Sequence, residues 1–161
     1  MEKLSRSLKS AITTALQRNK SILLLGSRQV GKTTLLMELS IDRTITLARP
    51  AIRQQYEQNI ETYSQEIESF AEKIGKKPLI AVDEIQKVPE LMDATQDLID
   101  RNIAQFILTG SSARKLKKQH QLNWLPGRVV YFHLDPLTLQ ELPKSHQQLE
   151  KILLYGTLPG I

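Results

Sequence analysis

The sequence predicts an α/β fold of three layers, in which helices cover both faces of a mostly parallel, five-stranded sheet. Five short apolar runs have the length and composition of strands: residues 21–25, 43–47, 79–84, 105–109 and 129–134. Segments with apolar residues at helical spacing separate most of these runs, and a glycine-rich loop directly follows the first run. Such alternation predicts parallel strands that are connected by right-handed crossovers.

The chain opens with a helical pattern. Within residues 1–20, apolar side chains recur at the spacing of one helix face. We expect an amphipathic helix that packs against the sheet and leads into the first strand. Its apolar positions are Leu4, Leu8, Ala11, Ile12, Ala15 and Leu16.

The loop at residues 26–33 has the pattern G-x-x-x-x-G-K-[ST], the P-loop or Walker A motif. Gly26 and Gly31 allow backbone angles that a Cβ atom excludes, so the loop can aim its N–H groups at an anion. The helix expected after it, running to about Ile41, adds partial positive charge at its first turn. A chance match is the alternative, and the strand before the loop and the helix after it argue against chance.

The residue types of this loop indicate their roles. Lys32 is expected to reach the β- and γ-phosphates of a nucleotide, and the Thr33 hydroxyl is expected to bind Mg²⁺. The sequence therefore predicts a three-layer α/β/α P-loop NTPase. The predicted nucleotide-binding residues are Gly26, Ser27, Arg28, Gln29, Val30, Gly31, Lys32, Thr33 and Thr34.

A long helical pattern follows the second strand. Pro50 marks the end of the turn that leaves this strand. Apolar residues from Tyr56 to Ile74 then recur in steps of four and three, which predicts one helix of about five turns. Its tyrosines either pack in the core or stack on an adenine ring, and a stripe at helical spacing favours the core.

Two adjacent acids end the strand at residues 79–84. Open α/β sheets bind their ligands at the carboxyl ends of such strands. Asp83 fits the Walker B role of holding Mg²⁺ opposite Thr33, mainly through water. Glu84 is placed to polarise the water that attacks the γ-phosphate. Solvated acids at a strand end are the alternative, which the P-loop upstream makes the weaker one.

The remaining elements continue the alternation. A helix at residues 89–101 precedes the strand that ends in Thr109, our candidate for a sensor of the γ-phosphate. A strand-end threonine that caps a turn is the competing interpretation. The last strand is followed by two expected short helices, which contain Leu139, Leu142, Leu149, Ile152 and Leu153.

Glu84 also predicts the order of the strands. An acid directly after the Walker B aspartate indicates a class of hydrolases that use a glutamate. In that class an additional strand lies between the P-loop strand and the Walker B strand. We therefore expect the sheet order 5-1-4-3-2, with the strands numbered along the chain.

Composition sets the outer bounds. The chain has 161 residues, no cysteine and a formal net charge of +5. It is long enough for one domain with a core, and it excludes disulfides and thiolate metal sites. Without an apolar run of membrane-spanning length or a secretory signal core, we expect a cytoplasmic protein with no membrane contact. The charge suits either nucleic-acid contact or nucleotide binding alone, and its clearest cluster is the basic run at residues 114–118.

Several segments resemble the prokaryotic predicted AAA+ ATPases, and together they cover essentially the whole chain. The Walker A and Walker B segments match this family in their flanking residues as well as in the core motifs. The matching segments are residues 25–35, 81–89, 108–116, 125–128, 137–142 and 155–159.

The resemblance implies ATP binding and Mg²⁺-dependent hydrolysis to ADP and phosphate. It also implies a longer protein, because members of the family usually continue into a C-terminal region. We therefore expect one AAA+-like ATPase domain over residues 1–161, cut short before a further domain. Its expected parts are an N-terminal helix at 1–20, a nucleotide-binding core at 21–135 and C-terminal helices at 136–161.

In AAA+ proteins the block before the last strand often carries an arginine finger, and Arg128 matches that position. Such a finger would act on the site of a neighbouring subunit, which requires a homo-oligomer. Arg114 is a second candidate for a similar role. The alternative for Arg128 is an ion pair with an acid on the surface of its own subunit.

Two functions stay open on the sequence alone. The first is an ATPase whose catalytic residues are Lys32, Glu84, Thr109 and Arg128. The second is a nucleotide-gated binding module in which ATP only switches a partner surface, and the basic run would make that partner DNA. A small-molecule kinase is disfavoured, because the two adjacent acids at residues 83–84 would activate water.

Overall fold

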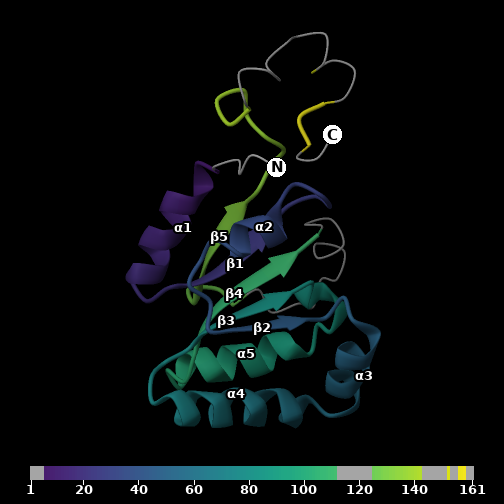
Figure 1. Ribbon diagram of the computed structural model, residues 1–161. Coiled ribbons are helices and arrows are strands. Elements are labelled where there is room, and N and C mark those ends of the chain that lie inside the picture. Colours follow the sequence, from purple (N-terminus) through teal and green to yellow (C-terminus); the bar gives the residue numbers. More distant parts are fainter. Residues whose placement is uncertain (1–5, 112–124, 143–151, 153–155, 159–161) are drawn as a thin grey trace.

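The computed structural model describes residues 6–111, 125–142, 152 and 156–158. Helices and strands alternate through most of this part, as Figure 1 shows. In chain order the elements are α1 (Leu8–Gln17), β1 (Ser21–Leu25), α2 (Lys32–Leu36), β2 (Arg43–Thr46), α3 (Pro50–Gln58), α4 (Ile60–Ile74), β3 (Leu79–Asp83), the 3₁₀ turn η1 (Ile85–Lys87), α5 (Leu91–Asp100), β4 (Gln105–Gly110) and β5 (Val129–His133).

The five strands form one sheet in the order β2-β3-β4-β1-β5, and every pairing is parallel. This is the predicted order 5-1-4-3-2 taken from the other edge, so the prediction is confirmed. Because the strands are parallel, the carboxyl ends of β1, β3 and β4 all lie at the same end of the sheet. The glycine-rich loop and the two adjacent acids therefore lie at that end.

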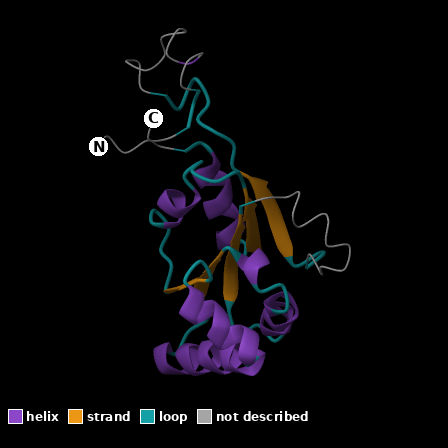
Figure 2. Cartoon of the chain, turned by 90° about the vertical axis from the view of Figure 1, so that its right-hand side faces the viewer, coloured by secondary structure: helices purple, strands orange, loops and turns teal. Residues whose placement is uncertain are grey.

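Helices cover both faces of the sheet, which divides the core into two layers (Figures 1 and 2). Alternate residues of a strand point to opposite faces. Leu23 of β1 packs in the layer under α4 and α5, whereas its neighbours Ile22 and Leu24 pack in the layer under α1 and α2. Phe106 and Ile107 of β4 divide in the same way.

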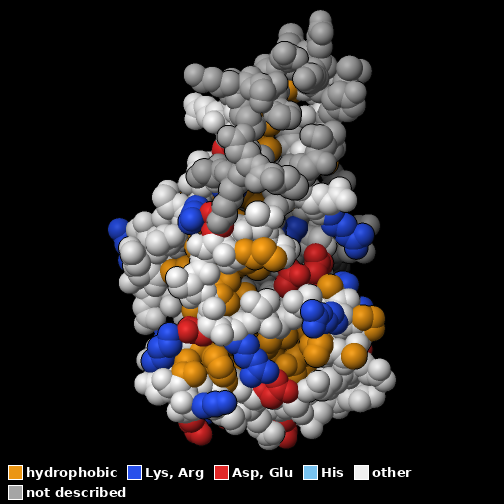
Figure 3. Space-filling model, viewed as in Figure 1, with side chains coloured by type: hydrophobic (Ala, Val, Ile, Leu, Met, Phe, Trp, Pro, Cys, Tyr) orange, Lys and Arg blue, Asp and Glu red, His pale blue; other side chains and the backbone are white. Residues whose placement is uncertain are grey.

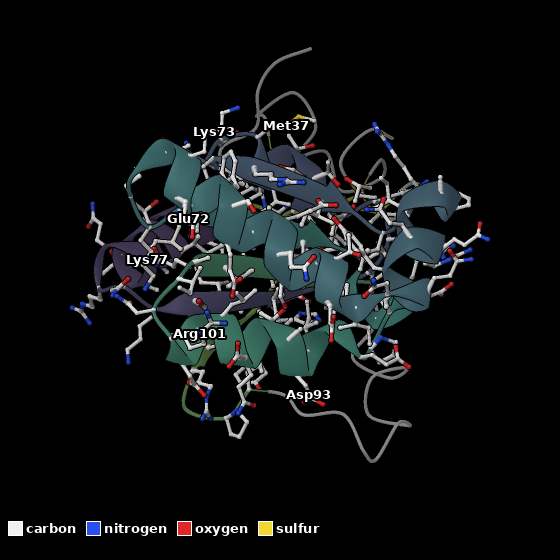
Figure 4. All side chains as sticks on the ribbon, turned by 90° about the horizontal axis from the view of Figure 1, so that it is seen from below. Met37, Glu72, Lys73, Lys77, Asp93 and Arg101 are labelled. Atoms are coloured by element: carbon white, nitrogen blue, oxygen red, sulfur yellow. The ribbon has the colours of Figure 1, made fainter. Side chains whose placement is uncertain are left out.

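The helices α4 and α5 lie side by side across one face of the sheet (Figure 4). The hydroxyls of Tyr63 and Thr95 bond between them at 2.9 Å, and both side chains are fully buried. At the surface, Arg101 donates to Glu68 at 2.6 Å. The helix predicted at residues 89–101 is confirmed as α5, and its Leu91 and Leu98 are buried.

The prediction of a single helix from Tyr56 to Ile74 is wrong. Asn59 is extended, with φ −150° and ψ 97°, and it separates α3 from α4. Tertiary contacts hold this bend: the rings of Tyr56 and Tyr63 meet edge to face, 5.5 Å apart. The carboxylate of Glu66 accepts hydrogen bonds from Tyr56 and from Arg43 of β2. Both tyrosines are buried and belong to the hydrophobic core, which supports the core interpretation.

Two further helix boundaries differ from the predictions. The helix α2 ends at Leu36, not near Ile41, because the chain tightens into turns that must reach β2. The apolar pattern continues through these turns, since Leu39 and Ile41 still pack against the core. Residues 139–142 form a turn where a short helix was expected, and Pro143 follows them in the sequence, which disfavours further helix. Most of the second expected helix, including Leu149 and Leu153, lies outside the described residues.

Candidate functional site

The loop at residues 26–31 has a backbone that turns sharply between β1 and α2. Gly31 has φ 98°, as expected for a glycine of this motif, and Gln29 also adopts a left-handed conformation, with φ 66°. Gly26 does not lie in the left-handed region, which corrects the expectation for this residue. A Cβ atom there would lie 2.4 Å from the backbone oxygen of Leu134, so glycine is needed for close approach and not for its backbone angles.

Lys32 lies inside this loop and is only 7% exposed. Its ammonium donates hydrogen bonds of 2.8 Å to the carbonyl oxygens of Gly26 and Ser27. Burial lowers the pKa of Lys32, while the negative charges of Glu84 and Asp83 oppose that shift. An ammonium has three donors, so two bonds to the loop leave one for an anion. Because α2 has only five residues, any anion held here depends on the loop amides and on Lys32.

Asp83 and Glu84 lie where β3 ends, beside the end of β4. Thr109 of β4 is fully buried, and its Oγ1 donates to Asp83 Oδ1 at 2.5 Å. The same oxygen accepts a bond of 3.3 Å from the backbone N–H of Glu84. Glu84 has φ 62° and ψ 44°, a left-handed conformation that costs a residue with a side chain about 1–2 kcal/mol. The structure therefore brings together the acids and the threonine that the sequence singled out.

Two further side chains contact Glu84, and the sequence analysis missed both. Ser111 Oγ donates to Glu84 Oε2 at 2.9 Å, and Gln86 Nε2 donates to the same oxygen. Gln86 and Ser111 also bond to each other at 3.0 Å. Their signal in the sequence is weak, because a serine in a turn and a glutamine after an acidic pair are common in any surface loop.

A cleft of about 750 Å³ opens beside the acids. Thr33 and Asp83 are among the residues that line it, and most of the others come from α2, β2, α3 and the turns between them. Figure 3 shows hydrophobic side chains that reach the molecular surface between basic and acidic ones. A hydroxyl and a carboxylate that open to one space suit Mg²⁺, which prefers oxygen ligands and keeps several waters. Among the described residues no group of three or more His, Cys, Asp or Glu side chains forms a separate metal site.

Arg128 lies apart from these residues. It directly precedes β5, so it lies at the amino ends of the strands. Lys32 and Asp83 lie at the carboxyl ends, on the opposite side of the sheet's length. Its Nε donates to Asp100 Oδ1 at 2.7 Å. This contact is a surface ion pair of the kind given above as the alternative to an arginine finger. Arg114 and the basic run at 114–118 lie outside the part of the chain that the structure describes. Within that part, no helix is both long and apolar enough to span a membrane.

A parallel sheet in this order, with a glycine-rich loop and a buried lysine after β1, defines the chain as a nucleotide-binding P-loop NTPase. The comparison with protein families agrees and is more specific. A family model described as an AAA domain matches residues 18–143, and the chain belongs to that family. The resemblance to AAA+ proteins stated from the sequence is thereby confirmed.

Known relatives extend well beyond this chain. Over 147 residues it is 30% identical to the uncharacterized protein Rv2008c of Mycobacterium tuberculosis and equally to Mb2031c of Mycobacterium bovis. Each match covers 90% of this chain and 31% of the relative, so the chain spans about a third of the length of the curated relatives it matches.

Solved structures share the fold at low sequence identity. PCH-2 of C. elegans superposes with a TM-score of 0.58 and 16% identity, over 86% of this chain and 45% of that one. The Pif1 helicases of a structure on DNA unwinding give a TM-score of 0.53 and 12% identity, over 88% of this chain and 46% of theirs. At these identities the similarity shows the fold alone.

Proposed function

We propose that this domain binds ATP together with Mg²⁺ and hydrolyses the nucleotide to ADP and phosphate. The observation that carries the proposal is the position of Lys32 relative to the two acids. Lys32 begins α2 directly after the loop that follows β1, and Asp83 and Glu84 lie where the parallel strand β3 ends, so the ammonium and both acids are at the same end of the sheet. The charges of both acids also oppose the lowering of the Lys32 pKa by burial. A cation that binds phosphate and an acid that activates water must lie this close together in a phosphoryl-transfer site.

Each residue has a distinct role in this proposal. The loop amides and Lys32 hold the phosphate groups, while Thr33 and Asp83 hold Mg²⁺ directly or through water. The ion would neutralise charge that develops on the phosphate oxygens. Glu84 orients the attacking water and accepts its proton as the water oxygen bonds to the γ-phosphorus and the bond to the β-phosphate oxygen breaks. Thr109 holds Asp83 and the backbone of Glu84, so both acids keep their positions.

Binding and turnover of two variants test the proposal. We expect Lys32→Ala to abolish the heat of binding of Mg·ATP in calorimetry, whereas Lys20→Ala, an exposed lysine at the amino edge of the sheet, should leave it unchanged. Glu84→Gln should keep nucleotide binding and lower phosphate release by at least about 100-fold. Hydrolysis at the normal rate by Glu84→Gln would show that Glu84 is not the base. Well-folded protein that binds no Mg·nucleoside triphosphate would refute the whole proposal.

A further inference from the structure

The end of β4 supplies one hydroxyl to each of the two acids at the end of β3. Thr109 bonds to Asp83, and two residues later Ser111 bonds to Glu84. Residues i and i+2 of an extended chain face the same side, and β3 and β4 are paired in register at Val82 and Leu108. The Thr109–Asp83 bond continues this register by one residue. The Ser111–Glu84 bond is offset from it by one residue, since the register would set Gly110 opposite Glu84, and it forms where the backbone of Glu84 is left-handed. Gln86 closes the arrangement from the turn η1 by bonding to both Glu84 and Ser111.

Building on the proposed function, we propose that Gln86 and Ser111 are positioning residues. They fix the Glu84 carboxylate so that it can orient the attacking water and accept its proton. Both donors bind the same oxygen, Oε2. Among the described residues, none donates a hydrogen bond to Oε1. One oxygen of the carboxylate is thus anchored, and the other is left to accept the proton of a water molecule.

The cost of the arrangement supports a functional origin. Glu84 adopts a left-handed backbone that residues with a side chain avoid, and such conformations concentrate at functional sites. Gln86 buries its Oε1 atom with no hydrogen-bond partner in the described part of the chain. An unpaired buried acceptor is unfavourable. Fold stability alone would not select a glutamine whose amide is only half satisfied, whereas a donor aimed at Glu84 explains it.

Turnover and binding measured on matched variants test the inference. Ser111→Ala removes the hydroxyl, and Gln86→Met keeps the length of the side chain but removes its donor. We expect each to lower kcat roughly 10- to 100-fold, because a misplaced catalytic group costs that much, with the Kd for Mg·ATP unchanged. Ser111→Thr, which keeps a hydroxyl, should restore most of the rate. Gln65→Met, on the exposed side of α4, serves as the control for the glutamine change.

A double-mutant cycle separates positioning from a merely structural role. If Gln86 and Ser111 act through Glu84, their removal in a Glu84→Gln background should not lower the residual turnover further. A readout independent of activity is the NMR signal of the Gln86 side-chain amide, assigned by its loss in Gln86→Met. In the nucleotide-free protein this signal should shift on Glu84→Ala and on Ser111→Ala, and stay in place on Gln65→Met.

Three results would overturn the inference. The first is an unchanged kcat in both Ser111→Ala and Gln86→Met, while the wild type hydrolyses ATP and Glu84→Gln does not. This result would leave the proposed function intact. Another is a parallel loss of nucleotide binding and melting temperature, which would assign the two residues to stability. A wild-type protein that binds Mg·ATP but never turns it over would remove the proposed hydrolysis, and this inference with it.

Discussion

Thr109 and Asp83 are joined across two neighbouring strands by a hydrogen bond of 2.5 Å, from the threonine hydroxyl to carboxylate oxygen Oδ1. The hydroxyl is fully buried, and it also accepts the backbone N–H of Glu84. A single oxygen atom therefore touches both acids at the end of β3. In the proposed ATPase, Thr109 holds these acids in place, and its own contact with phosphate is not required for this effect.

Replacing Thr109 by valine tests that relationship, because valine keeps the shape and loses the hydroxyl. We expect kcat to fall on the order of tenfold, with nucleotide affinity retained. Leaving the Glu84 N–H without its partner should also lower the free energy of unfolding by about 1–3 kcal/mol. Thr109→Ser is the control, since it keeps the donor. Normal turnover by Thr109→Val would remove Thr109 from the mechanism.

Substitution of two glycines by alanine should separate close approach from backbone conformation. A Cβ on Gly26 would lie 2.4 Å from the Leu134 oxygen, so the loop or the backbone after β5 must shift. We expect Gly26→Ala to weaken Mg·ATP binding at least about tenfold, because the loop amides move with it. Gly75→Ala meets no atom within 4 Å but keeps φ at +65°, so it should cost about 1–2 kcal/mol of stability and no affinity. Equal affinities in calorimetry for both variants would contradict this assignment.

The ion pair between Asp42 and Lys76 should make stability depend on acid. Lys76 donates to Asp42 Oδ1 at 2.6 Å and the N–H of Leu79 donates to Oδ2 at 2.8 Å, and these bonds lower the pKa of Asp42. A carboxyl whose pKa is lower in the folded state stabilises the fold above its ordinary pKa, and loses this contribution as the pH falls through the folded value.

Urea unfolding of wild type and Asp42→Asn measures this contribution. At about pH 6 the wild type should be more stable by up to about 1 kcal/mol, since Lys76 is largely exposed. The difference should shrink as the pH falls below the ordinary pKa of an aspartate and through the lowered folded value, where the carboxyl is protonated in both states. A difference that stays constant across this range would mean that the ionised form of Asp42 contributes nothing.

Arg128 and Asp100 give a matched pair for the arginine-finger hypothesis. If their ion pair is only structural, Arg128→Ala and Asp100→Ala should have the same small effect on the melting temperature and none on turnover. If Arg128 completes the site of a neighbouring subunit, Arg128→Ala alone should lower kcat by about 10³-fold or more. Specific activity should then rise with protein concentration in the wild type and stay flat in Arg128→Ala.

The sheet could be predicted in full because its signals are local or follow from the chemistry of one segment. Five apolar runs gave the strands, and Glu84 directly after Asp83 gave their order. The break at Asn59 could not be predicted, since the apolar pattern runs through it unchanged. It coincides with contacts to Glu66, whose carboxylate accepts hydrogen bonds from two other parts of the chain: Gln55 and Tyr56 of α3, and Arg43 of β2.

The residues of the candidate site also divide into those that the sequence predicts and those that it does not. Lys32, Thr33, Asp83 and Glu84 belong to two motifs whose spacing carries their chemistry. Gln86 and Ser111 belong to no such motif. Gln86 lies two positions after Glu84, a separation without special meaning in a sequence, whereas Ser111 lies 27 positions away from Glu84 and 25 from Gln86. Pairing of this kind becomes visible only once β3 and β4 lie next to each other.

The phosphate-binding loop and the Arg128–Asp100 ion pair lie at opposite ends of the parallel strands. A strand of five residues spans roughly 16 Å, so the two ends of the sheet are separated by about that distance. Fluorescent dyes, affinity handles or surface tethers attached near Lys20 would therefore sit beyond the reach of a bound nucleotide. Immobilised in that orientation, the domain would present its loop to solvent for single-molecule or surface-based measurements.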